Sequence, residues 1–463
     1  MKRTNDLGRD SIWSLVLRLC IPTMLAQLVS VLYSIVDRMY IGAGVGDLAL
    51  AGVGVCAPIV TLLSSFATLV GLGGSPILAM RMGEGKRDQA QRILNNCFLL
   101  LLVLSAVLTL LFLLTKDYLL MWFGASEATF GYADTYLTIY TCGTFFALLS
   151  TGMNSFLICQ GFSGLGMATV VLGAALNIVL DPLFIFVFHL DVAGAAWATV
   201  ISQAASCLFV LLSLLRKKVP IRLGWGGFDR GIMKRVLLFG LSPFLTIATD
   251  SILLIVLNTV LQRFGGPGEG DILITCATIV QSFMLIITMP MGGITLGGQP
   301  VVSFNYGAGQ IDRIKRAVRA IVTLCLAFCA LMLVVTHTIS PLFVRLFTSD
   351  PVILERSVRY IKVFTCMILP LAIQYPLVDE TIAMGHLRLA LFCSMFRKSV
   401  FLVCLVLLPM LVSAEATFWS EPIADVIAAL VTGTLFLRLI PRSLVDRANA
   451  VAQQTMSGPA GHT

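Results

Sequence analysis

Acidic and amide side chains occur inside long apolar runs of this sequence. Moving a carboxylate to the centre of a bilayer costs about 2.5–3.5 kcal/mol on insertion scales, so an acid at that depth is by default a candidate functional residue. A carboxylate in an apolar environment can hold a proton, a metal cation or an organic cation. The candidates are Asp37, Asn177, Asp181, Asp250, Asp379 and Glu380.

Asn177 and Asp181 form the most specific pattern among these candidates. Their i, i+4 spacing places an amide donor beside a carboxylate on one helix face. Pro182 follows directly and frees a backbone carbonyl, which favours a local kink. Because burial favours the protonated carboxyl group and a bound organic cation opposes protonation, a proton and a cation would compete for this pair. Such competition is the basis of an exchange mechanism.

The remaining acids occupy other apolar runs. Asp37 lies at the outer end of the first run and Asp250 lies in the seventh. Asp379 and Glu380 are adjacent in the tenth, where they could line the second half of the protein. For each of these residues the alternative is a carboxylate that caps or cross-links helices.

The composition indicates a membrane protein. Of the 463 residues 58% are hydrophobic and only 12% are charged, and the mean hydropathy is +0.94. No water-soluble fold hides so much apolar surface. The apolar runs predict an all-α integral membrane protein of about twelve transmembrane helices. The expected spans are residues 14–36, 52–80, 94–115, 136–159, 168–187, 193–215, 236–261, 272–303, 318–340, 358–384, 388–411 and 418–440.

Basic residues indicate the orientation of these spans. Most of the 32 lysines and arginines fall in short loops on one face of the twelve-span arrangement, and Arg388, Arg397 and Lys398 are assigned to one such loop. By the positive-inside rule both termini are then cytoplasmic. The net charge of +8 therefore reflects membrane topology, and nucleic-acid binding is not expected.

An internal repeat divides the chain. Gly73-Gly74-Ser75-Pro76 recurs as Gly297-Gly298-Gln299-Pro300, and Gly83 and Asp88 recur as Gly307 and Asp312, all at an offset of 224 residues. Six spans is an even number, so the two halves share an orientation and are related by a pseudo-two-fold axis along the membrane normal. A central cavity between two six-helix lobes follows.

The expected domain organisation has four parts. Residues 1–215 form an N-terminal six-helix lobe, in which residues 9–19 have the apolar stripe and basic flank of a short amphipathic helix in the membrane interface. The other parts are a basic cytoplasmic linker at residues 216–235, a C-terminal lobe at residues 236–440 and a disordered cytoplasmic tail at residues 441–463. Because the duplicated fold is complete in one chain, a monomer is expected.

Cysteine and histidine patterns predict neither a cofactor nor a metal site. The 12 cysteines lie mostly inside apolar runs without CxxC spacing, and the 4 histidines are scattered. No enzymatic activity is expected.

Several motifs in order along the chain resemble those of the MATE family, the multidrug and toxic compound extrusion transporters. They are the run 22–42 with Asp37, the Pro58 helix that ends in Gly-Gly-x-Pro, the loop at 82–86, the segment 177–184 and the matching loop at 305–309. The resemblance extends over residues 15–439. It implies two six-helix lobes in a V shape and a bacterial inner-membrane antiporter that exports small organic cations in exchange for H⁺ or Na⁺.

The resemblance also implies roles for individual residues. Asp37 matches the family's helix 1 aspartate, and Asn177 and Asp181 match its helix 5 pair. The position 224 residues after Asp181 is Leu405, so the second half has no equivalent carboxylate and ion coupling is expected in the N-terminal lobe alone. Asp250 and Asp379 are possible counterparts of acids that one branch of the family carries in the second lobe.

Three other functions are compatible with parts of the sequence. A lipid-linked precursor flippase of the same superfamily would carry several basic residues in its cavity, whereas here the interior candidates are acidic. An intramembrane aspartyl hydrolase needs two carboxylates that share a proton, and nothing in the sequence brings Asp37 and Asp181 together. A passive channel has no need of duplicated lobes. Cation efflux is therefore the expected function.

Overall fold

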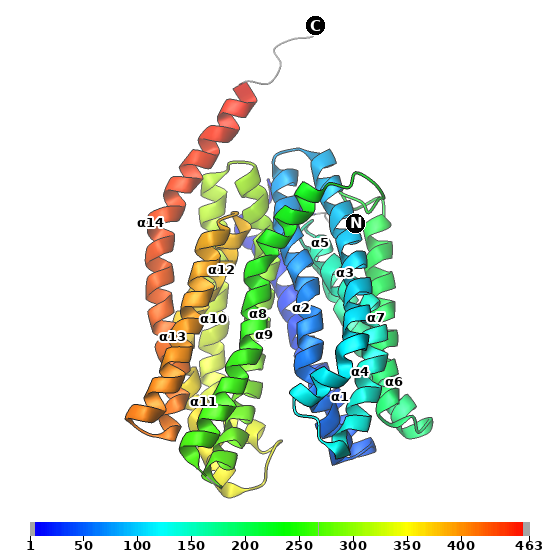
Figure 1. Cartoon of the computed structure of the whole chain (residues 1–463). Coiled ribbons are helices and arrows are strands. Elements are labelled where there is room, and N and C mark those ends of the chain that lie inside the picture. Colours follow the sequence, from blue (N-terminus) through cyan, green and yellow to red (C-terminus); the bar gives the residue numbers. More distant parts are fainter. Residues whose placement is uncertain (1–4, 267, 457–463) are drawn as a thin grey trace.

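The structure of the chain is a computed structural model that describes residues 5–266 and 268–456. Within these ranges every regular element is a helix (Figure 1). The first half contains α1 (Ile12–Gly44), α2 (Asp47–Gly83), α3 (Arg87–Trp122), α4 (Glu127–Cys142), α5 (Thr144–Ile158), α6 (Ser163–Pro182), η1 (Leu183–Val187) and α7 (Asp191–Leu215). The second half contains α8 (Arg230–Gly265), α9 (Glu269–Gly307), α10 (Ile311–Val344), α11 (Pro351–Thr365), α12 (Ile368–Ala383), α13 (Leu387–Leu411), η2 (Ala414–Trp419) and α14 (Ser420–Met456).

The helices of the described residues account for ten to twelve membrane crossings. In the described part of the chain, ten helices are long and apolar enough to span a bilayer. Two bent helix pairs, in which α4 meets α5 at 55° and α11 meets α12 at 51°, are together as long and apolar, and counting each pair as one span gives twelve. The bent pairs occupy equivalent places in the two halves. The predicted all-α fold with about twelve transmembrane helices is confirmed.

The two halves form two helical bundles (Figure 1). One apolar core lies among the helices of the first half and another among those of the second. The repeat also appears in the backbone, because Gly85 and its equivalent Gly309 both adopt left-handed conformations, with φ of 76° and 69°. Glycine takes this conformation without a steric cost, so the same turn follows α2 and α9.

The lobes touch at the end of the molecule that carries both termini of the described chain, at the top of Figure 1. There α2 packs on α8 and α9, and α1 packs on α9. A Cβ atom on Gly83 would lie 1.9 Å from the carbonyl oxygen of Phe304, and one on Gly307 would lie 2.1 Å from that of Met80. These two contacts are equivalent under the repeat offset. The glycines of the repeated motif therefore allow the backbones of the two lobes to meet.

A cluster of charges joins the lobes at the same end. Glu84, which follows α2, pairs with Arg81 at 2.6 Å, with Lys86 at 2.9 Å and with Arg447 of α14 at 2.6 Å. Arg447 also donates to the carbonyl oxygen of Gly307 at 3.1 Å. Burial alone would raise the pKa of Glu84, but the hydrogen bonds from Lys86, Arg81 and Arg447 outweigh it and hold that pKa below its ordinary value.

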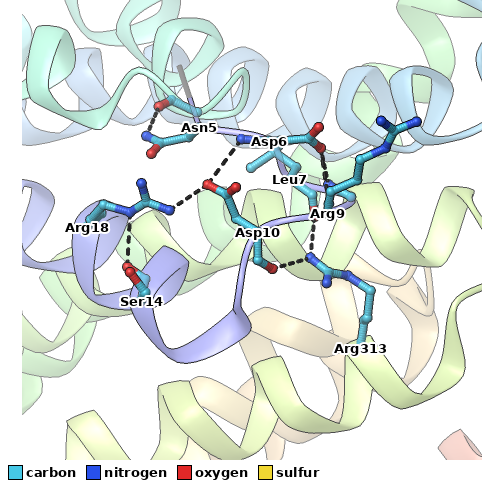
Figure 2. A network of polar contacts seen from close by, with 10 residues as sticks. Asn5, Asp6, Leu7, Arg9, Asp10, Ser14, Arg18 and Arg313 are labelled. Carbon is cyan, nitrogen blue, oxygen red and sulfur yellow. Dashed lines mark hydrogen bonds and ion pairs between the residues drawn. The ribbon is translucent and has the colours of Figure 1, made fainter. Parts of the chain in front are cut away.

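The segment before α1 bridges the two lobes as well, and Figure 2 draws its contacts. Asn5 donates through Nδ2 to the carbonyl oxygen of Gly161 in the first lobe at 2.8 Å. Arg313 of α10 donates through Nη2 to the carbonyl oxygens of Leu7 at 3.0 Å and Asp10 at 2.9 Å. The N-terminal segment therefore crosses the boundary between the lobes.

Residues 9–19 do not form a separate interfacial helix, so that expectation is wrong. α1 begins at Ile12 and continues without a break through the span. Leu15, Val16 and Leu19 are fully buried and belong to the apolar core of the second lobe. The apolar stripe packs against protein rather than lipid, because the second lobe offers it a matching surface.

The expected tail boundary is also wrong. α14 runs on to Met456, so residues 441–456 are helical rather than disordered, and Arg447 ties this extension to both lobes. The basic linker is shorter than expected, because α8 already begins at Arg230. Lys2, Arg3 and residues 457–463 lie outside the described residues.

Candidate ion and substrate site

The first lobe brings together the three residues that the sequence singled out there. Asp181 is 0% exposed and Asn177 is 3% exposed. Asn177 donates through Nδ2 to Asp181 Oδ1 at 3.2 Å and lies 3.5 Å from Thr199 Oγ1 of α7. Asp37 of α1 meets them, with its carboxyl group within hydrogen-bonding reach of that of Asp181. The cluster therefore joins α1, α6 and α7.

The local sequence explains why α6 ends beside this pair. Proline has no N–H group, so Pro182 cannot continue the helical ladder. The chain passes into the π-helical turn η1, in which the N–H of Phe188 donates to the carbonyl oxygen of Leu183 at 3.0 Å. Single π-helical turns are frequent at functional sites. The distortion expected at Pro182 thus takes the form of a π-helical turn directly after Asp181.

Besides Thr199, sequence reasoning missed three residues of this cluster. Tyr136 and Tyr140 of α4 stack with their ring centroids 6.2 Å apart, and Gln203 of α7 donates through Nε2 to the hydroxyl of Tyr140 at 3.4 Å. Tyr136 lies close enough to Asp37 to interact with its charge. The available signal was the i, i+4 spacing of the two tyrosines, which puts both rings on one helix face. Aromatic faces next to carboxylates suit an organic cation.

Several acceptor oxygens of the cluster have no donor among the described residues. They are Asp37 Oδ1, Asn177 Oδ1, Asp181 Oδ2 and Gln203 Oε1. A buried acceptor without a donor is costly. Two adjacent carboxyl groups cannot both ionise without a compensating positive charge. A proton shared by the acids, or a cation bound between them, would satisfy the cluster.

The acids of the tenth span lie in the second lobe, away from this cluster. Asp379 accepts a hydrogen bond from Thr295 Oγ1 of α9 at 2.6 Å. Glu380 is 0% exposed, and neither of its carboxyl oxygens has a hydrogen-bond partner within the described ranges. Consecutive helical residues point about 100° apart, so the two side chains face different neighbours. They do not form a second copy of the first-lobe pair.

The structure corrects the position of two basic residues. Arg397 and Lys398, which were expected in a loop, lie about 15 Å or more along α13 at 1.5 Å per residue. Arg397 pairs with Glu421 and, at 2.9 Å, with Asp425 of α14. Lys398 pairs with Asp250 of α8. The loop prediction is wrong because carboxylates on neighbouring helices neutralise both charges inside the lobe.

These placements change the weight of two alternatives. The structure brings Asp37 and Asp181 together, so the ground for discounting an aspartyl hydrolase disappears. The argument against a flippase was that basic residues lie only in loops. Arg397 and Lys398 lie inside the second lobe, so that argument no longer holds. The choice of function then depends on the family.

Comparison with known proteins identifies that family. The MatE family model matches residues 22–183 and 246–410, which include most of both lobes. The chain belongs to the MatE family. The resemblance based on its motifs is thereby confirmed. MatE proteins are multi-pass membrane transporters, which agrees with the expectation that the chain is not an enzyme.

Individual relatives of this MatE chain match it over nearly its whole length. Multidrug export protein MepA of Staphylococcus haemolyticus (strain JCSC1435) is 26% identical, over 96% of this chain and 97% of its own length. The protein of the same name from Staphylococcus aureus (strain N315) is 23% identical, over 96% of this chain and 97% of its own.

Solved structures share the fold of the MatE chain. One, an outward-facing conformation of a multidrug resistance MATE family transporter of the MOP superfamily, has a TM-score of 0.87 and 23% identity, covering 98% of this chain and 100% of that one. Another, a MOP superfamily transporter from Pyrococcus furiosus described as having a binding pocket of reversed polarity, has a TM-score of 0.87 and 23% identity, covering 97% and 100%. The two-lobed all-α fold is thus that of the MATE transporters.

Proposed function

We propose that the chain is a multidrug efflux transporter that exchanges small organic cations for protons or sodium ions, and that Asp37, Asn177 and Asp181 bind both. The observation that carries this proposal is the meeting of two carboxyl groups beside an amide inside the first lobe. Because the acids cannot both be ionised without a positive charge between them, the cluster takes up a proton, a sodium ion or an organic cation. The names of the MepA relatives support drugs as substrates.

Exchange follows from competition for one cluster. An organic cation stabilises the ionised carboxylates and expels the proton or sodium ion, and the coupling ion expels the organic cation in turn. Since linkage is reciprocal, each ligand weakens the other by the same factor. A gradient of the coupling ion then drives the cation out of the cell. Coupling belongs to the first lobe, because the second-lobe position equivalent to Asp181 is Leu405, which is buried in the apolar core.

The orientation of the protein is part of the proposal. The end at which the lobes meet carries Arg81 in the last turn of α2, Lys86 and Arg87 directly after α2, and the basic linker before α8, so by the positive-inside rule it is cytoplasmic. Both termini then lie in the cytoplasm of a bacterial cell, and the lobes are closed toward it. This is the arrangement from which a substrate leaves outward. One chain is sufficient, because each lobe has its own core.

The proposal is tested by transport in vesicles. Purified protein is reconstituted, and movement of tetraphenylphosphonium is followed under an imposed proton gradient and then under a sodium gradient. Wild type is expected to move the cation under one of them, and Asp181→Asn and Asp37→Asn are expected to abolish the driven component. The matched control is Asp117→Asn, an exposed acid of the same lobe, which should transport like wild type. Driven transport that survives in both site variants would contradict the assigned cluster.

A lipid-linked precursor flippase is the second candidate, and one observation favours it. Arg397 and Lys398 lie inside the second lobe, where an anionic lipid head group would need basic residues. Both are paired with acids, and Asp250, Glu421 and Asp425 outnumber them, so the lobe interior is not positive. Wild-type vesicles that fail to move tetraphenylphosphonium under either gradient but flip a fluorescent pyrophosphate-linked lipid would favour this candidate.

A further inference from the structure

The second lobe contains a cavity of about 330 Å³ whose lining residues all belong to that lobe. Its walls come from α11, from the end of α13, and from η2 with the first turn of α14. Figure 1 shows the connection between α13 and α14 at the end of the molecule opposite the one where the lobes meet. In the orientation proposed above this end is the outer one, so the cavity lies at the outer surface of the membrane.

Stacked aromatic rings form one wall of the cavity. The rings of Tyr360 in α11 and Phe418 in η2 are nearly parallel, with centroids 4.0 Å apart and planes at 8°. Both side chains are buried, at 3% and 1% exposure. The backbone of η2 is held by a hydrogen bond from the N–H of Ala416 to the carbonyl oxygen of Ser413 at 3.0 Å. The wall is therefore preorganised, and a ligand that binds against it has little chain to order.

The hydroxyl group of Tyr360 is a buried polar group in this wall. It has no hydrogen-bond partner among the residues that the structure describes. It lies close enough to Glu415 to interact with the charge of that carboxylate. A buried hydroxyl without a partner is costly. A ligand with an N–H donor could therefore satisfy the tyrosine and the carboxylate together.

Two side chains of opposite charge line the cavity without pairing. They are Arg359 of α11 and Glu415 of η2, and within the described ranges neither takes part in an ion pair. The neighbouring Arg356, by contrast, is paired with Glu269 of α9. Because the cavity presents both charges, it is complementary to a ligand that carries an anionic and a cationic group. A ligand with only one charge would meet a side chain of like charge, which disfavours it.

The mouth of the cavity is apolar and open to lipid. Val412 and Trp419 both line the cavity, yet they are 74% and 48% exposed, and the adjacent Leu411 is 77% exposed. An exposed tryptophan at the end of a membrane helix is typical of the aromatic belt at the level of the lipid head groups. The volume is near the lower limit of ligand pockets, which measure about 300–1,000 Å³. It therefore suits a head group whose acyl chains stay outside, along the exposed apolar residues.

We infer that this cavity binds the head group of an outer-leaflet phospholipid that carries both a phosphate and a primary ammonium group, as phosphatidylethanolamine does. The guanidinium group of Arg359 binds the phosphate, because its N–H groups match the phosphate oxygens. The ammonium group donates to the carboxylate of Glu415 and to the hydroxyl oxygen of Tyr360. The inference goes beyond cation exchange, and it depends on the proposed function only for the orientation that makes this end the outer one.

Lipid binding to charge variants tests the inference. Native mass spectrometry of the purified full-length chain in detergent measures the affinity for phosphatidylethanolamine and for phosphatidylglycerol, which is anionic and lacks the ammonium group. Arg359→Gln is expected to weaken phosphatidylethanolamine binding about tenfold. Glu415→Gln should weaken phosphatidylethanolamine but strengthen phosphatidylglycerol, since it removes an acceptor for the ammonium and a repulsion of the phosphate. The matched controls are Arg345→Gln and Glu355→Gln, which change exposed charges of the same lobe and should bind both lipids like wild type.

Three outcomes would overturn the inference. The first is affinity for phosphatidylethanolamine within about threefold of wild type in Arg359→Gln and Glu415→Gln. The second is a Glu415→Gln variant that changes the affinity for both lipids in the same direction. The third is free phosphoethanolamine that binds as tightly as the lipid, which would make the ligand a soluble molecule.

A variant without a charge change gives an independent test. Ala416 lines the cavity, so Ala416→Leu should fill part of it and weaken the binding of both lipids. Unchanged binding in this variant would also contradict the site. The assay contains neither an ion gradient nor an organic cation. A failure of wild-type vesicles to move tetraphenylphosphonium would therefore contradict the proposed function without affecting the result for lipid binding.

Discussion

Replacing Gly83 by alanine is expected to open the end of the molecule at which the two lobes meet. The new methyl carbon would lie 1.9 Å from the carbonyl oxygen of Phe304. Carbon and oxygen atoms approach to about 3.3 Å in close contacts, so α2 and α9 must separate by roughly 1.4 Å. Overpacking of this kind costs about 1–3 kcal/mol. The cost falls on the closed arrangement alone, so the equilibrium shifts about 5–150-fold toward opening.

A native cysteine reports this opening. Cys20 is 1% exposed and lies at the contact of α1 with α9, where a Cβ atom on Gly297 would come within 2.7 Å of Cys20 Cα. When opening precedes labelling, the rate of alkylation by N-ethylmaleimide follows the open population and rises by the same factor. Peptide mass spectrometry measures the rate at Cys20. Cys97, which is 0% exposed in the first-lobe core, is the internal control and should not change.

The matched variant is Gly54→Ala on the same helix, where a Cβ atom would meet nothing within 4 Å among the described residues. It should label at Cys20 like wild type. Gly307→Ala should reproduce the effect of Gly83→Ala, since its Cβ would lie 2.1 Å from the carbonyl oxygen of Met80. If a folded Gly83→Ala protein labels at Cys20 within twofold of wild type, the steric reasoning is refuted.

Three further predictions concern charged side chains, two at the boundary between the lobes and one inside the second lobe. The pKa of Glu84 is held below its ordinary value of 4.5, so the charged side chain stabilises the fold above that pH, by about 1.5–3 kcal/mol. This contribution is lost as the pH falls through the lowered pKa of the folded state. The difference in Tm between wild type and Glu84→Gln should therefore shrink as the pH is taken from neutral to below 4.5. Arg313→Ala removes two hydrogen bonds to the N-terminal segment, so limited trypsin cleavage at Arg9 should accelerate about tenfold, whereas exposed Arg319→Ala should leave the rate unchanged. Arg397→Met leaves the Asp425 carboxylate buried and unpaired, so the free energy of unfolding should fall by about 3–5 kcal/mol, and an unchanged Tm would contradict the buried pair.

The large-scale architecture could be predicted from the sequence because it depends on local properties. Apolar length determines which segments can cross the bilayer, and each of the twelve expected spans corresponds to one apolar helix or to one bent helix pair, in the same order along the chain. The glycine motif at an offset of 224 residues predicted two equivalent lobes. It could do so because a left-handed turn, such as those at Gly85 and Gly309, depends on a single glycine. Asn177 and Asp181 could be paired because their spacing lies within one helix.

Contacts between helices could not be predicted in the same way. Whether Asp37 reaches Asp181, and whether Gln203 reaches Tyr140, depends on how α1, α4, α6 and α7 pack, which no residue spacing within one helix records. Arg397 and Lys398 looked like loop residues because charge favours water over lipid unless a partner is present. Their partners lie on α14 and α8, and only the tertiary fold brings those carboxylates to them.

The sequence by itself therefore determined the membrane setting, about twelve spans, the duplication and the identity of the intramembrane acids, because each follows from composition or short-range spacing. The tertiary structure alone decided which acids share a site, which are neutralised by basic residues and where the lobes touch. Those outcomes depend on distances between segments far apart in the chain, where a shift of one helix by a few ångströms makes or breaks an ion pair.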